Sequence, residues 1–486
     1  MIYKLRPYQE ECVKSISDYI NSDRHDPVLV IGPVGCGKSI LIAEAARLMG
    51  DKTLVLQPSR ELLIQNYCKL TSYGIPATIY SASCGKKELS NMIYATLGSI
   101  KKVVGQLKEM GIRNVLIDEA HAGYSPEDGS EFMTFMNELK PRKVIGFTAT
   151  PCRLKNMSIG QTSYSQLNFI TRMRPVYFKN LIHVIQVEEM IRQEFWTPLK
   201  YETWDFNGDA LKLNSNGSEY TAESISEAVR KNGLNNLILR RLMVLKDICR
   251  SILVFMDSVE SCNTAAEWMN AKICAGIAEV VHGGTPKKQR EAIVERFKSG
   301  KTKVVFNYSA LGTGFDHPGL DCVIVGRPTF SFSSFYQWLG RAVRIKDGKD
   351  SALVVDCCNN SSRFGDIREL SIENYKGYGW GMFIGDKLIT NIPMGDKVTK
   401  TDLDIKAAKK DRRRGLAQGV TAAPVPGRPD HPLGSTLMAF GKYCGWMLHS
   451  IPVSYFKFIN ETFDWDNGRN KEIKEYIDFL IKNNRL

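Results

Sequence analysis

A short glycine-rich segment near the N-terminus holds the residues best suited to bind phosphate. In the segment GPVGCGKS, Gly32 is followed after four residues by Gly37, Lys38 and Ser39. Gly35 and Gly37 leave backbone N–H groups open to an anion, so this spacing predicts a loop that surrounds the phosphates of a nucleotide. Lys38 would contact the β- and γ-phosphates, and the Ser39 hydroxyl would bind Mg²⁺. An ordinary strand-to-helix turn could give the same spacing, so a second part of the site is needed.

Two adjacent carboxylates provide that second part. Asp118 and Glu119 follow the apolar stretch NVLI, which reads as a buried strand. Strand ends in a doubly wound parallel sheet lie beside the phosphate loop, so these carboxylates are expected near Lys38. We predict that Asp118 holds Mg²⁺ together with Ser39, and that Glu119 orients or deprotonates the attacking water. We therefore favour a role for this pair in nucleotide hydrolysis over the alternative, a carboxylate pair in a surface turn.

A third group of candidates lies far along the chain, in the segment QWLGRAVR. Arg341 and Arg344 are three residues apart and would share one face of a helix. Presented across a cleft, two guanidinium groups would neutralise the charge that spreads onto the transferred phosphate. Taken alone, the same spacing fits two solvated helix arginines, so the assignment depends on the other motifs.

The elements that must position these residues form two series of short apolar runs separated by helical patterns. The first series, from Pro27 to about Pro151, reads VLVIG, TLVLQPS, ATIYSAS, KKVVGQL, NVLIDEA and KVIGFTATP. The second, from about Arg250, reads SILVFMDS, AEVVHGG, TKVVFNYS, DCVIVGRP and SALVVDCC. Such alternation predicts two α/β units, each with a parallel sheet covered by helices.

Changes in composition give the expected domain boundaries. The region between the two series is polar and carries an aromatic run, EFWTPLKYETWDF, whereas the region after the second series is basic and then proline-rich. We predict a first lobe at 1–151, a connector at 152–235, a second lobe at 236–395, a basic and proline-rich linker at 396–432, and a small accessory domain at 433–486.

Composition narrows the class of protein. The 486 residues are 43% apolar and carry a formal charge of +13, which favours a globular protein with a polyanionic partner such as nucleic acid. The twelve cysteines contain no C-x-x-C pair, so no zinc or cluster site is expected and the thiols fit a reducing compartment. Neither a secretory signal nor a membrane-length apolar run is present, so we expect a cytoplasmic protein with no membrane partner.

Taken together and in order, these motifs resemble the superfamily 2 helicases, specifically the group whose second acidic motif reads D-E-A-H. The resemblance covers about residues 1–395, with GPVGCGKS as motif I and Asp118 to His121 as motif II. It implies a fold of two tandem RecA-like parallel-sheet lobes, here followed by a small C-terminal domain. It also implies ATP and Mg²⁺ as cofactors and the first lobe as the ATP-binding lobe.

The resemblance assigns the remaining motifs as well. Gln9 in LRPYQ would contact the adenine base, and Arg60 in QPSREL would contact the nucleic-acid backbone. The other implied positions are Thr148 and Thr150 of FTATP, which couple the nucleotide site to the strand-binding face; Gly314 and Asp316 of ALGTGFDHP, which lie between the two sites; and Gln337, Arg341 and Arg344 of QWLGRAVR, which act at the γ-phosphate.

Two residues bear on the substrate. RNA-directed relatives commonly begin the last motif with His and end the acidic motif in Asp, whereas this chain has Gln337 and His121. The chain most resembles the fork-reversal and branch-migration helicases of bacteriophages and related repair helicases. This implies an ATP-dependent DNA helicase that remodels forks or junctions, in the host cytoplasm if the protein is from a phage. An RNA-unwinding helicase, a nucleotide-switched DNA-binding scaffold and a translocating subunit of a nuclease complex stay open as alternatives.

The region after the second lobe offers further candidates for DNA binding. The strip KKDRRRG contributes Lys409, Lys410, Arg412, Arg413 and Arg414, and the terminal domain contributes Lys442 and Lys457. These cations could track phosphates, or the strip could be a solvated linker. Five aromatic residues of the terminal domain could stack on bases, but in so small a domain we expect them to form the core: Phe440, Tyr443, Trp446, Tyr455 and Phe456.

Overall fold

The computed structural model describes residues 4–159, 162–311, 315–376, 378–407, 432–436, 438–439, 443, 447–462 and 470–483. The chain divides into two compact units. The first comprises 1–374 and 380–398 and contains both large sheets, and the second comprises 375–379 and 399–486.

The first large sheet has the strand order β10-β1-β7-β6-β2-β5-β3-β4 among the described residues. Its strands are β1 (Val28–Ile31), β2 (Thr53–Leu56), β3 (Thr78–Ser81), β4 (Lys86–Lys87), β5 (Met92–Ala95), β6 (Asn114–Ile117), β7 (Lys143–Thr148) and β10 (Asn180–Val184). All of its pairings are parallel except β3 with β4. The central strands β1, β2, β6 and β7 are buried along their whole length, as expected when helices cover both faces.

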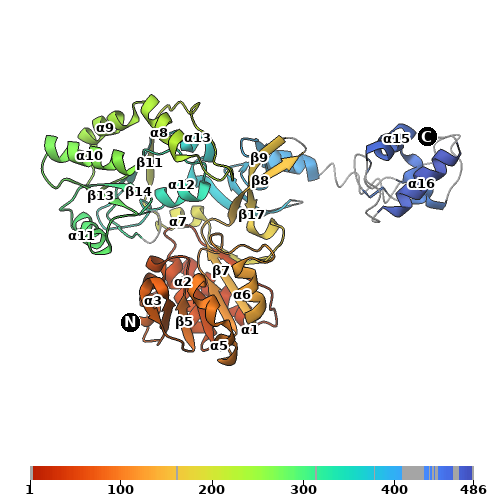
Figure 1. Cartoon of the computed structure of the whole chain (residues 1–486), viewed down its shortest axis with the longest axis horizontal. Helices are drawn as coiled ribbons and strands as arrows, with labels where there is room; N and C mark the ends of the chain where they lie inside the picture. Colours follow the sequence, from red (N-terminus) through yellow and green to blue (C-terminus); the bar gives the residue numbers. More distant parts are fainter. Residues whose placement is uncertain are drawn as a thin grey trace. The chain divides into compact units, whose positions relative to one another are not determined.

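Helices α1 (Pro7–Asn21), α2 (Lys38–Met49), α3 (Arg60–Thr71), α4 (Leu97–Ile100), α5 (Val104–Glu109) and α6 (Glu131–Leu139) belong to this first lobe (Figure 1). Two of these helices begin at serine caps. The Ser59 hydroxyl accepts a hydrogen bond from Leu62 N at the start of α3, and the Ser130 hydroxyl accepts one from Met133 N at the start of α6. These caps satisfy backbone donors that a helix start otherwise leaves unpaired.

The second large sheet has the order β11-β16-β15-β12-β14-β13, and all of its pairings are parallel. Its strands are β11 (Leu199–Thr203), β12 (Ile252–Phe255), β13 (Ala278–His282), β14 (Val304–Tyr308), β15 (Cys322–Val325) and β16 (Ala352–Asp356). The helices of this lobe are α8 (Ala222–Lys231), α9 (Leu234–Ile248), α10 (Val259–Lys272), α11 (Lys287–Lys298), α12 (Phe332–Leu339) and α13 (Asn360–Phe364). The predicted fold of two parallel-sheet α/β lobes is confirmed.

The region assigned to a connector contributes to both sheets. It forms the hairpin β8 (Cys152–Ile159) and β9 (Thr162–Phe169), and then β10, helix α7 (Val187–Arg192) and β11. Strand β10 pairs with β1 at the edge of the first sheet, and β11 pairs with β16 at the edge of the second. The connector therefore supplies one edge strand to each lobe, and the boundaries at 151 and 235 remain predictions.

One of the expected strands is helical. The run KKVVGQL forms a 3₁₀ turn (Lys101–Val103) followed by α5, in which Val104 and Leu107 are buried three residues apart, as on one helix face. The strand that completes this part of the sheet is instead β5, which was not expected from its sequence. A four-residue buried strand has too short a pattern to stand out from a buried helix segment.

A smaller sheet follows the second lobe, with the order β17 (Leu370–Tyr375), β18 (Gly379–Ile384), β19 (Lys387–Leu388) and β20 (Val398–Thr399). Further short 3₁₀ turns lie at Ala82–Cys84, Ile170–Arg172, Ile367–Glu369, Pro432–Ser435 and Leu448–Ser450. Within the described residues, none of the helices has the length and apolar character needed to cross a membrane.

The C-terminal unit contains α15 (Val453–Thr462) and α16 (Lys471–Lys482) around a small core of its own. Phe456 is fully buried in that core, and Tyr443 and Tyr455 pack against it. These three aromatic residues therefore occupy core positions, as expected. Phe440 and Trp446 lie outside the described residues.

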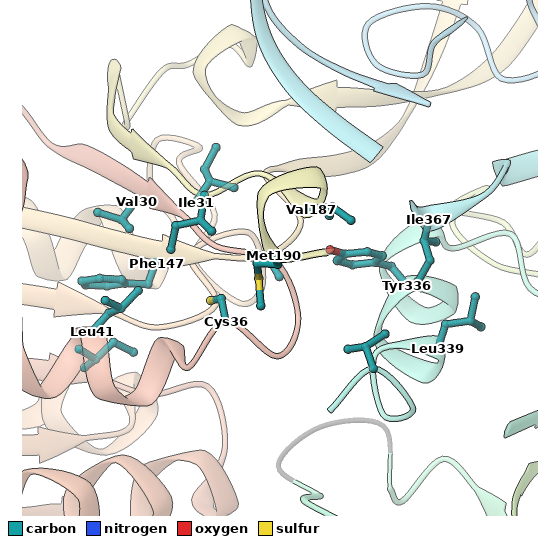
Figure 2. Close-up of a cluster of buried hydrophobic side chains, with 14 of the residues drawn as sticks. Val30, Ile31, Cys36, Leu41, Phe147, Val187, Met190, Tyr336, Leu339 and Ile367 are labelled. Carbon is teal, nitrogen blue, oxygen red and sulfur yellow. The ribbon is translucent and has the colours of Figure 1, made fainter. Parts of the chain in front are cut away.

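The two lobes of the first unit share an apolar core. Figure 2 shows Tyr336 and Leu339 of α12 beside Val187 and Met190 of α7, with Cys36 of the phosphate loop nearby. All five side chains belong to one buried cluster. Helix α7 thus packs between the phosphate loop and the helix that begins the arginine-bearing segment.

Candidate nucleotide site

A cavity of about 320 Å³ is lined by residues of both lobes. Its volume is in the range of small-ligand sites. The predicted residues that line it are Gly35, Gly37, Lys38, Ser39, Asp118, Glu119, Asp316, Gln337, Arg341 and Arg344. Residues up to 309 positions apart in the sequence, Gly35 and Arg344, therefore meet in one cavity.

The phosphate loop has the backbone that the glycines predicted. Gly35 and Gly37 have φ values of 83° and 84°, in the left-handed region that favours glycine. A side chain at Gly37 would also clash, because a Cβ there would lie 2.6 Å from Nε2 of Gln9. Helix α2 begins directly afterwards at Lys38, so its unpaired N-terminal N–H groups and its positive dipole end lie at the cavity.

Lys38 and Glu119 form an ion pair inside the cavity, with Lys38 Nζ 2.7 Å from Glu119 Oε1. Burial alone would lower the pKa of Lys38, but the carboxylates of Glu119 and Asp118 raise it overall. Burial alone would likewise raise the pKa of Glu119, yet the ammonium of Lys38 and the neighbouring His121 lower it. Both groups are therefore charged at neutral pH.

Asp118 lies deeper and has a different environment. One of its carboxylate oxygens accepts a hydrogen bond from Glu119 N at 2.8 Å, and the other accepts one from Asn66 Nδ2 at 2.8 Å. Burial and the adjacent charge of Glu119 raise the pKa of Asp118 well above its usual range. A cation at this carboxylate would offset the repulsion from Glu119 and lower this pKa.

His121 joins the acidic motif to two threonines and to the second lobe. Its Nδ1 lies 2.8 Å from the Thr148 hydroxyl, and its Nε2 lies 3.1 Å from the Thr150 hydroxyl and 3.2 Å from the Ser333 hydroxyl. Burial lowers the pKa of His121 to about 4, so the ring is neutral at physiological pH. Glu119 Oε2 is also near, 3.4 Å from Nδ1.

The two arginines of QWLGRAVR do not share a helix face as predicted, because α12 ends at Leu339, before either arginine. Both are held by the segment that follows the glycines of ALGTGFDHP. Arg341 donates a hydrogen bond to the carbonyl of Phe315 at 2.7 Å, and Arg344 forms an ion pair with Asp316. Burial lowers the pKa of Arg341 to about 10, with Glu119 acting in the opposite direction, so this guanidinium is still charged at neutral pH.

Other predicted residues lie away from the cavity surface. Gln9 is buried, and its side chain donates to the Cys36 carbonyl at 2.8 Å and accepts from Arg6 N at 3.0 Å. Thr148 and Thr150 are also buried, facing His121 rather than solvent. Arg60 is the first residue of α3 and is partly buried. The base and strand contacts assigned to these four residues remain predictions.

The remaining candidates concern the C-terminal part of the chain and one glycine. Lys457 is exposed on α15. Gly314, Lys409, Lys410, Arg412, Arg413, Arg414 and Lys442 lie outside the described residues.

Sequence reasoning missed several residues that hold the site. Asn66 is fully buried against Asp118, and Ser333 reaches His121 from the other lobe. Trp196 donates from its indole Nε1 to the carbonyl of Val34 in the phosphate loop at 2.9 Å. None of these contacts follows a fixed sequence spacing, although the aromatic run around Trp196 was a visible signal.

Comparison with known families finds two matches along the chain. Residues 2–153 match the family described as type III restriction enzyme, res subunit, and residues 234–346 match the helicase conserved C-terminal domain. The two matches correspond to the first lobe and to most of the second.

Known proteins and structures agree with these matches. A 51.5 kDa protein of a Lactococcus phage is 25% identical over 332 residues, covering 68% of this chain and 65% of that protein. The putative ATP-dependent helicase IRC3 of Saccharomyces cerevisiae is 23% identical over 378 residues, covering 74% of this chain and 52% of that protein. The chain thus spans about half to two thirds of the length of these relatives.

A fragment of a putative HsdR subunit of a type I restriction enzyme from Vibrio vulnificus shares the fold. Its TM-score is 0.54 at 18% identity, over 75% of this chain and 67% of that fragment. The res-subunit match, the helicase C-terminal match, the two RecA-like lobes and the helicase relative together support a superfamily 2 helicase enzyme.

Proposed function

We propose that this protein is an ATP- and Mg²⁺-dependent DNA helicase or translocase that acts on branched DNA. The observation that carries the proposal is the shared cavity, in which the phosphate loop and carboxylates of one lobe face the arginines of the other. Such a site is complete only while both lobes contribute to it. Binding and release of nucleotide would therefore change how the lobes contact each other, which is what a motor requires.

The ion pair between Lys38 and Glu119 supports a role for both residues in hydrolysis. A triphosphate in the loop would compete with Glu119 for the Lys38 ammonium, because it carries more negative charge than one carboxylate. Glu119 would then be released to accept a proton from an attacking water. The low pKa of Glu119 favours the carboxylate form needed for that step.

The chain also has suitable donors for magnesium. Asp118 and the Ser39 hydroxyl both line the cavity and offer the oxygen ligands that Mg²⁺ prefers. Among the described residues, no group of three His, Cys, Asp or Glu side chains could hold a metal alone. Asp118 and Ser39 therefore fit an ion that takes its other ligands from nucleotide phosphate and water. When bound, Mg²⁺ would neutralise charge on the phosphates.

Arg341 and Arg344 would complete the site from the second lobe. Phe315 and Asp316 are their partners at the cavity. We infer that a bound γ-phosphate draws Arg341 toward the reacting group, where its positive charge stabilises the transition state. Arg341→Ala should then reduce stimulated turnover about 10³-fold while leaving nucleotide affinity nearly unchanged.

The DNA preference and the preference for branched substrates rest on the sequence. The acidic motif ends in His121 and the last motif begins with Gln337, a combination that favours DNA over RNA in the families this chain resembles. A net charge of +13 fits a polyanionic substrate. The D-E-A-H assignment and a role in replication, recombination or repair belong to the same proposal.

The test compares ATP hydrolysis and strand displacement on single strands, linear duplexes, forks and four-way junctions, in DNA and RNA versions. We expect the highest stimulation and displacement with forked or four-way DNA. Stimulation by RNA alone would favour the RNA-unwinding alternative. Multiple-turnover hydrolysis that is absent with every nucleic acid would leave only a nucleotide-switched scaffold.

A further inference from the structure

Three hydroxyl groups surround the His121 ring, and one of them comes from the second lobe. Thr148 and Thr150 belong to the first lobe, whereas Ser333 lies in the first turn of α12. The Ser333 hydroxyl lies 3.2 Å from His121 Nε2 and 3.1 Å from the Thr150 hydroxyl. Ser333, Thr150 and the ring nitrogen therefore form a triangle of hydrogen-bonding groups that spans the two lobes.

The triangle has a defined hydrogen-bonding capacity. A neutral imidazole has one N–H and one lone pair, and each hydroxyl has a single hydrogen to donate. If Nδ1 carries the ring proton, toward Thr148 and Glu119, then Nε2 is an acceptor and needs a donor from Thr150 or Ser333. Removing the Ser333 hydroxyl takes away one of the only two donors seen at this nitrogen among the described residues.

Ser333 connects the arginine-bearing segment of the second lobe with Glu119 of the first lobe. It lies four residues before Gln337 and eight before Arg341, on the element that leads to the arginines. Ser333 contacts His121, and His121 in turn contacts Glu119, the residue proposed to activate water. Displacement of α12 relative to the first lobe would break this contact and would also move Gln337, which lies on the same helix and lines the cavity.

We propose that Ser333 is a positioning residue that links closure of the second lobe to the orientation of His121 and hence of Glu119. This inference rests on the proposed hydrolytic function and deepens it by naming a cross-lobe contact that regulates the site. Among the described residues Ser333 does not line the nucleotide cavity, and its hydroxyl instead contacts His121 and Thr150, so it acts through these two side chains.

The experiment compares Ser333→Ala with wild type in ATP hydrolysis with and without forked DNA. Loss of one hydrogen bond in the triangle should lower the DNA-stimulated kcat about three- to tenfold, with the KM for ATP and the Kd for DNA unchanged. Ser333→Thr keeps a hydroxyl and should restore most of the stimulation. The matched control is Ser334→Ala on the same helix, because its hydroxyl donates to Ser331 within the second lobe and should not affect turnover.

A double-mutant cycle with Thr150→Val tests whether the two hydroxyls act together. If they do, the double variant should be about as impaired as the worse single variant. Multiplied losses, or unchanged stimulation in Ser333→Ala, would overturn the inference. Unfolding free energies of the same four proteins test the contact without any activity, and additive changes there would also overturn it. If wild type hydrolyses no ATP while the unfolding cycle is non-additive, the proposed function fails and the contact stands.

Discussion

Replacing Gly340 with alanine adds one methyl group at the point where the end of α12 meets the phosphate loop. Gly340 has an ordinary helical φ of −61°, so alanine causes no backbone strain there. The new Cβ would lie 2.6 Å from Cβ of Val34, in the other lobe. Carbon atoms pack at about 3.5–4.0 Å, so the helix end and the loop must separate by about 1 Å.

That displacement should impair turnover more than folding. Overpacking of this kind typically costs about 1–3 kcal/mol, and the two lobes can relieve it by moving apart. Arg341 is the next residue and would move with the backbone. If the whole cost falls on the closed, reactive state, the stimulated kcat should fall about 5- to 150-fold. The assay is steady-state ATP hydrolysis on forked DNA, together with thermal unfolding to show that the variant is folded.

Two further variants serve as a matched control and as a rescue of the Gly340→Ala variant. Gly105→Ala is the matched control, because Gly105 is exposed in α5 and a Cβ there meets nothing within 4 Å. It should leave turnover unchanged. Val34→Gly removes the three atoms nearest to the new methyl, so it should restore part of the activity of Gly340→Ala. A fully active and stable Gly340→Ala variant would show that the loop and the helix end do not meet in the working enzyme.

Four other outcomes are expected. Glu119→Gln should retain nucleotide binding but lose about 10²- to 10⁴-fold in kcat, and near-normal turnover would reject its role as base. Lys143→Met should lower the unfolding free energy by about 1–3 kcal/mol in urea titrations, because the buried ammonium donates to the carbonyls of Tyr19, Ser22 and Arg24. Burial and nearby lysines lower the pKa of His317 to about 4 from 6.5, so the unfolding free energy should fall as the pH drops from about 6.5 toward 4, and His317→Asn should flatten that dependence. A chain ending at Ala407 should still hydrolyse ATP but show a shallower salt dependence of DNA binding, by about one unit for each phosphate that the removed cations neutralise, and an identical slope would argue against a DNA role for the C-terminal region.

Much of the fold could be predicted because its strands are buried on both faces. Runs such as TLVL and CVIV are continuously apolar, and their repeated alternation with helical patterns, rather than any single four-residue run, identifies a parallel sheet. The expected strand at KKVVGQL was wrong because two valines side by side resemble a strand, whereas Val104 and Leu107 in fact share a helix face. Strands β10 and β11 were missed because partly polar edge strands lack that continuous pattern.

Some residues of the candidate site could likewise be predicted from the sequence, and others could not. Gly37, Lys38 and Ser39 could be found because a phosphate loop demands certain residue types at fixed spacing along one segment. The residues that contact and position the site could not be found from the sequence. Asn66 and Asp118 are 52 residues apart, and Ser333 and His121 are 212 apart, so only the folded chain brings them together. Serine and asparagine are also common in loops and caps, so neither residue is distinctive by type.

The connector ties the two halves of the site to adjacent residues. Trp196 donates to the Val34 carbonyl of the phosphate loop at 2.9 Å, and Thr197 donates from its backbone N to the Val343 carbonyl at 2.8 Å and from its hydroxyl to the Arg344 carbonyl at 2.7 Å. One dipeptide thus holds the loop on one side and the arginine segment on the other. A change in the loop on nucleotide binding must either break the Trp196 contact or move Thr197 with it. Because Thr197 holds the backbone of the arginine segment, the second lobe would respond to nucleotide through the connector as well as through the phosphate itself.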